Sequence, residues 1–227
     1  MLKYLLIPLL MLSLSQCTLN PTRQIDERCN LLNRQSAVFL TEFHFDNDST
    51  YLDSALYVIN QALEICDCEE LRILLSFRKL AVLSLTRDYE QALQFIKLLE
   101  NEELDLVLFP FSGNVLYRRF QAMQAQYLGN MTERNEHLRF IVNRIADYLM
   151  ENRQEVDAIF TVSDATGVLK GIGMAIIQYY YYRSVLEGVD VVTAELVLMQ
   201  EKEGINKDVV EGIIVFLEAD FMIFWGW

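Results

Sequence analysis

Apolar residues recur at intervals of three and four along most of this chain, and this spacing limits the possible folds more than any other feature. In residues 52–66 the apolar side chains fall near one face of a helix: Leu52, Ala55, Leu56, Ile59, Leu63 and Ile65. The same spacing returns in residues 69–86 and 89–99. The 227 residues include only nine Gly and three Pro, too few for the many turns of a β-sandwich. We therefore predict an all-α fold.

Turn and capping residues divide this pattern into segments. Gly129-Asn130 and Gly188 are typical of helix ends, and Asp190 and Asn206 are typical N-caps. The predicted helices are 25–45, 50–66, 69–86, 88–101, 114–128, 131–152, 165–187, 190–203 and 206–224. Short connections between long helices favour antiparallel hairpins. We expect residues 206–224 to cap the last hairpin, with an exposed partner-binding helix as the alternative.

The first residues are typical of a targeting segment. A basic start precedes an apolar run from Tyr4 to Leu14, which is too short for a bilayer span of about 20 residues. Leu14-Ser15-Gln16-Cys17 resembles the lipobox of bacterial lipoproteins. This resemblance implies a signal peptide at 1–16, a lipid on Cys17 and a tether at 17–24. Plain secretion and an uncleaved cytosolic start are the alternatives.

A repeated pattern marks several of the hairpins. Arg87-Asp88-Tyr89-Glu90-Gln91-Ala92-Leu93 resembles the turn and second helix of a tetratricopeptide repeat, in which a small Ala lets two helices approach and a large residue, here Ile96, fills the gap. Residues 51–62 repeat this pattern, and Tyr127-Leu128-Gly129-Asn130 repeats the turn, with Arg134 in place of the small residue. The resemblance implies that residues 25–227 are one domain, a stack of hairpins forming a solenoid. A non-repetitive helical bundle is the alternative.

The same resemblance implies a binding face. Proteins of this family present a concave face made by the first helix of each hairpin. Placing the family's turn on this chain assigns six partner-binding residues to that face: Phe77, Arg119, Met123, Gln126, Gln178 and Tyr182. An Arg on such a face can hold a peptide carboxylate with two parallel hydrogen bonds. Tyr179–Tyr182 either pack in the core or contribute to this groove.

The cysteines allow a disulfide but not a metal site. Cys29 lies near the start of the first predicted helix, and Cys66 and Cys68 lie at the end of the second, so a hairpin would bring them together. A disulfide from Cys29 to Cys66 or Cys68 is one expectation, and buried thiols are the other. Neither His has a ligand-like spacing to these cysteines, so we expect no metal and no cofactor.

The net charge and the lack of a catalytic motif argue against two classes of function, nucleic-acid binding and catalysis. The formal net charge of −13 would repel a phosphate backbone, so we do not expect nucleic acid as a partner. No nucleophile motif supports an enzyme. We expect a membrane-anchored scaffold that binds a protein or peptide in the bacterial envelope, at the outer membrane. The alternatives are a small-molecule or glycan binding protein using the aromatic C-terminal half, and a soluble periplasmic or secreted location.

Overall fold

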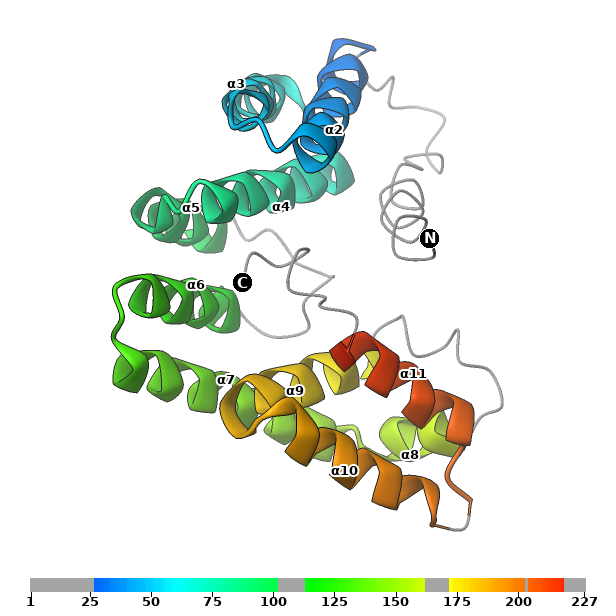
Figure 1. Ribbon diagram of the computed structural model, residues 1–227. Coiled ribbons are helices and arrows are strands. Elements are labelled where there is room, and N and C mark those ends of the chain that lie inside the picture. Colours follow the sequence, from blue (N-terminus) through cyan, green and yellow to red (C-terminus); the bar gives the residue numbers. More distant parts are fainter. Residues whose placement is uncertain (1–26, 102–112, 162–171, 203, 219–227) are drawn as a thin grey trace. The chain divides into compact units, whose positions relative to one another are not determined.

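The computed structural model describes residues 27–101, 113–161, 172–202 and 204–218, and within them every regular element is a helix. The prediction of an all-α fold is confirmed. Figure 1 labels the helices α2 (Glu27–Asp46), α3 (Thr50–Ile65), α4 (Glu69–Leu85), α5 (Tyr89–Asn101), α6 (Gly113–Tyr127), α7 (Met131–Glu151), α8 (Arg153–Thr161), α9 (Ile172–Glu187), α10 (Val189–Gln200) and α11 (Lys207–Glu218). The predicted signal peptide, Cys17 and the tether lie outside the described residues, as do residues 165–171 and 219–224 of two predicted helices.

One helix was not predicted from the sequence. Asn152 ends α7 by donating its backbone N–H to the carbonyl of Tyr148, and its own carbonyl accepts from Glu155 and Val156. The chain therefore begins α8 at once, without a Gly or Pro between the two helices. Since Phe160 is the only buried side chain of α8, the segment has little apolar pattern to mark it.

Of the two predicted N-caps, one is confirmed and one is wrong. Asn206 accepts a hydrogen bond from the Asp208 N–H at the start of α11. Asp190, by contrast, lies inside the first turn of α10, whose N-cap is Gly188. The structure also shows Asn130 capping α7, where its side chain accepts from the Glu133 N–H. Gly188 has a φ of +101°, a conformation that only Gly adopts without strain.

The described chain divides between Ala92 and Leu93, within α5, into two compact units. In the first unit, α3 packs between α2 and α4 around a core that includes Ala55, Ile59 and Ala62, all fully buried. The structure joins Cys29 of α2 to Cys66 in a disulfide, with the Cα atoms 5.5 Å apart. Cys68 lies two residues further on and is half-buried. The single domain at residues 25–227 stays a prediction.

A buried cation also connects α2 and α4. Arg78 donates from Nη1 to the Asn33 carbonyl at 2.7 Å, to the Ser36 hydroxyl at 2.9 Å and to the Asn33 side-chain oxygen. All three residues are buried. Burial lowers the pKa of Arg78 to about 10, because the protein interior disfavours the charged form.

Two neighbouring cores are found among the described residues of the second unit. Leu138, Ile141 and Ile145 of α7 pack with residues of α6 and α9. Val192 and Leu196 of α10 pack with Val209, Val210 and Ile213 of α11 and with side chains of α8 and α9. Helix α9 contributes to both cores, which explains why apolar side chains cover most of its circumference.

Removing the disulfide should destabilise the first unit. We expect the double variant Cys29→Ala, Cys66→Ala to lose about 4 kcal/mol of unfolding free energy, because the cross-link no longer restricts the unfolded chain. Urea unfolding of the full chain, followed by hydrogen exchange in α2 and α3, measures the loss.

Cys68→Ala is the control. We expect its unfolding free energy to be close to that of the wild type, because the variant keeps the disulfide between Cys29 and Cys66. Adding a reductant should lower the unfolding free energy of the wild type to that of the double variant. Equal stability of the double variant and Cys68→Ala would contradict the structural role of the disulfide.

Candidate functional site

Most of the six residues assigned to a binding face are covered rather than open to solvent. Phe77 is half-buried in α4 of the first unit, and the other five belong to the second. Four of these five are wholly or partly covered: Arg119 and Met123 are buried in α6, Tyr182 is buried in α9, and Gln178 is half-buried there. Gln126 is exposed at the end of α6.

Three of the six residues do meet around a small cavity. Arg119, Gln178 and Tyr182 line a space of about 30 Å³, which Phe216 and Leu217 of α11 help to enclose. Arg119 is hydrogen-bonded to Tyr182, and burial raises the pKa of the Tyr182 hydroxyl while Arg119 opposes the shift. This volume holds about one water molecule, far below the 300–1,000 Å³ of typical small-molecule sites.

The run Tyr179–Tyr182 is mostly core. Tyr180 and Tyr182 are buried, and Tyr179 and Tyr181 are half-buried. The Tyr180 hydroxyl donates to the sulfur of Met199 at 3.3 Å, and burial raises its pKa to about 12. These contacts tie α9 to α10.

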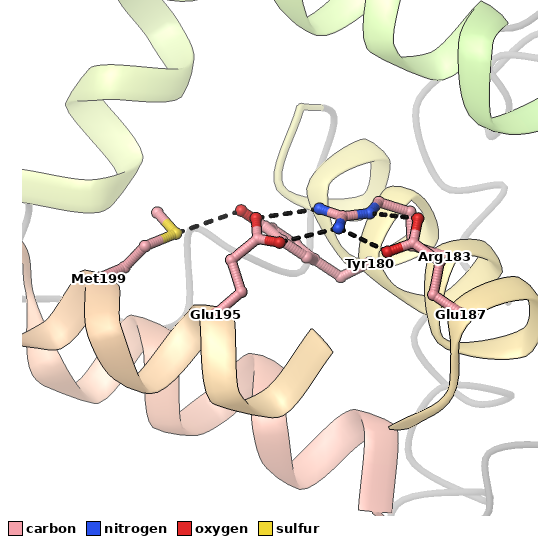
Figure 2. A network of polar contacts seen from close by, with 5 residues as sticks. All are labelled: Tyr180, Arg183, Glu187, Glu195 and Met199. Atoms are coloured by element: carbon pink, nitrogen blue, oxygen red, sulfur yellow. Dashed lines mark hydrogen bonds and ion pairs between the residues drawn. The ribbon is translucent and has the colours of Figure 1, made fainter. Parts of the chain in front are cut away.

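An ion-pair network joins the same two helices. Figure 2 shows Arg183 of α9 held between Glu187 of its own helix and Glu195 of α10. Its guanidinium donates twice to each carboxylate, at 2.7–3.0 Å, and lies over the Tyr179 ring. Hydrogen bonds from Arg183 lower the pKa of Glu187, and the two carboxylates raise the pKa of Arg183.

A histidine contact links α6 to α7. Arg118 Nη1 lies 3.1 Å from His137 Nδ1. Because Arg can only donate, this nitrogen accepts, and the proton lies on Nε2, which is 3.7 Å from Glu133. Burial, followed by Arg118, lowers the pKa of His137 against the opposing effect of Glu133 and Glu136. A neutral His137 therefore stabilises the hairpin between α6 and α7.

The sequence analysis missed a polar hollow beside α7. Its volume is about 230 Å³, and it is lined by Asn135, Arg139, Val142, Asn143, Leu186 and Glu187. Asn135, Arg139 and Asn143 are four residues apart, so they follow one face of the helix. The spacing of these three residues can be seen in the sequence. The sequence does not show, however, that the end of α9 lies beside this face of α7.

Two other kinds of site were searched for among the described residues. In this part of the chain, no three His, Cys, Asp or Glu side chains are placed to hold a metal ion together. Likewise, none of the described helices is both long enough and apolar enough to cross a bilayer.

Comparison with known proteins gives no relative. No protein-family model matches the chain, and neither a curated protein nor a solved structure shows significant similarity to it.

The Arg183 network should stabilise the packing of α9 on α10. Arg183→Met keeps much of the aliphatic length but removes five N–H donors, and we expect a loss of about 1–2 kcal/mol because the two carboxylates are only partly exposed. Urea unfolding measures the change.

Arg153→Met is the matched control, since Arg153 pairs with Asp157 on an exposed helix face at 3.7 Å. We expect it to change stability by less than about 0.5 kcal/mol. Equal losses in the two variants would mean that the Arg183 network contributes no more than an ordinary surface pair.

Proposed function

We propose that this chain is a helical scaffold that binds a protein or peptide partner in the bacterial envelope, held at the membrane by a lipid on Cys17. In this proposal the hairpins stack in the manner of tetratricopeptide repeats. The scaffold positions its partner and performs no chemistry on it.

The observation that carries the proposal is the exposed apolar turn between α6 and α7. Tyr127, Leu128 and Met131 are 56%, 71% and 49% exposed, and they lie next to Gln126, one of the six predicted binding residues. A cluster of large apolar side chains at a turn is costly in water, and such clusters on folded proteins mark interaction sites. A protein partner would remove this surface from water.

The disulfide supports the envelope location. Cys29 and Cys66 are both buried and joined. Structural disulfides persist in oxidising compartments such as the bacterial periplasm and are rare in the cytosol.

Site-specific photo-crosslinking in the native cell tests the proposal. A photoreactive phenylalanine analogue at Leu128 should give a discrete crosslinked product, because the proposed partner covers this turn. Adding Tyr127→Ser and Met131→Ser in the same chain should remove that product, since the variant loses the apolar contacts while keeping the capped turn.

The same analogue at Met150 is the matched control, because Met150 is an equally exposed apolar residue at the other end of α7. We expect no product there. Absence of a product at Leu128, or the same product at both positions, would contradict partner binding through the turn.

A further inference from the structure

Helix α10 exposes a row of apolar side chains to solvent. Val191 and Leu198 are 55% and 61% exposed, and they are seven residues apart, which is about two turns of a helix. Two smaller exposed residues stand between them. We call this set the α10 stripe, and its members are Val191, Ala194, Val197 and Leu198.

This exposure is unusual for a surface helix, which normally shows charged and polar residues to water. Helix α7 follows that rule over much of its exposed face, with Glu136, Arg139 and Arg144. Helix α10 does not, because Val192 and Leu196 on its opposite side are already completely buried. Apolar residues therefore line two sides of α10, and only one side is packed. Such a surface on a folded protein marks an interaction site.

Acidic side chains stand at both ends of the α10 stripe. Asp190 is exposed in the first turn of the helix, and Glu201 is exposed directly after its last turn. Lys202 adds one positive charge next to Glu201. The wider segment is acidic as well, because residues 183–218 contain eight Asp or Glu and three Lys or Arg.

A third carboxylate lies along one edge of the stripe. Glu195 is four residues after Val191 and three before Leu198, so it lies next to both on the helix surface. Arg183 binds Glu195 but is shared with Glu187, and the network of Figure 2 therefore keeps a net negative charge. The stripe is thus an apolar strip with an acidic surround.

These charges decide which kind of surface fits the stripe. A second copy of the chain would bring like charges together in either orientation, because both ends of the stripe are acidic. An anionic lipid surface would be repelled for the same reason. No described element is a strand whose edge could take an extended peptide, whereas a helix packs readily along another helix.

We propose that the α10 stripe binds an amphipathic helix of another protein. The apolar face of that helix packs on Val191 and Leu198, and its flanking Lys or Arg side chains pair with Asp190 and Glu201. None of the six residues assigned to a concave face belongs to α10, and the turn after α6 is a different surface. The inference therefore goes beyond the proposed function and does not depend on it.

Titration of the full chain with fluorescent, end-blocked peptides tests the proposal by anisotropy. The probe has about 15 residues, with Leu at helical spacing on one face and Lys on both sides of that face. We expect saturable binding that weakens as salt is added. A peptide of the same composition without the apolar face, and one with Glu in place of every Lys, should each bind at least about tenfold more weakly.

Two matched variants locate the binding surface. Leu198→Ser should weaken binding of the probe at least about fivefold, because it removes apolar surface from the stripe. Leu98→Ser, at a leucine of α5 that is 59% exposed, should leave binding unchanged. Equal affinities for the three peptides, or equal effects of the two substitutions, would overturn the proposal.

Photo-crosslinking from a reactive phenylalanine analogue at Leu198 in the native cell identifies the occupant. We expect a product joined to another protein, at a segment with an apolar face and flanking Lys or Arg. A product joined to a second copy, to residues 219–227 of the same chain, to lipid or to a segment without that pattern would overturn the proposal, as would the absence of a product. The Leu128 crosslink is read separately, so either surface can fail while the other stands.

Discussion

Every helix that the structure describes depends on burying apolar side chains against its neighbours. The described helices are 9 to 21 residues long, and isolated helices of such lengths are marginal in water. Ala55, Ile59 and Ala62 in the first unit, and Ile141 and Ile213 in the second, are completely removed from solvent. The exposed turn after α6, which we propose as the partner-binding surface, is part of what this burial leaves in contact with water.

Polar contacts then fix how the buried faces meet. Arg78 ties α4 to α2 in the first unit, and Arg183 ties α9 to α10 in the second. In the second contact one guanidinium serves both Glu187 and Glu195, so the network keeps a net negative charge at the edge of the hollow. A contact that stabilises the packing therefore also sets the charge of this part of the surface.

The fold was more predictable from the sequence than the site. The spacing of apolar residues predicted most of the helices, because the buried face of a helix follows directly from that spacing. Helix α8 was missed because only one of its side chains is buried, so its apolar pattern is weak. The spacing of residues could not predict that Arg119 and Tyr182 are buried. The side chains that help to enclose them, Phe216 and Leu217, belong to α11, which is distant in the sequence. The hollow likewise depends on α7 meeting the end of α9, a tertiary contact that no local pattern encodes.

The most direct test of an envelope-anchored scaffold is the intact mass of the protein isolated from its native cell after alkylation of its thiols. We expect a lipid-bearing membrane species that begins at Cys17 and disappears in Cys17→Ala, with Cys29 and Cys66 protected from alkylation by their disulfide. A full-length species that retains Met1 and is alkylated at Cys29 and Cys66 would contradict both the anchor and the oxidising compartment.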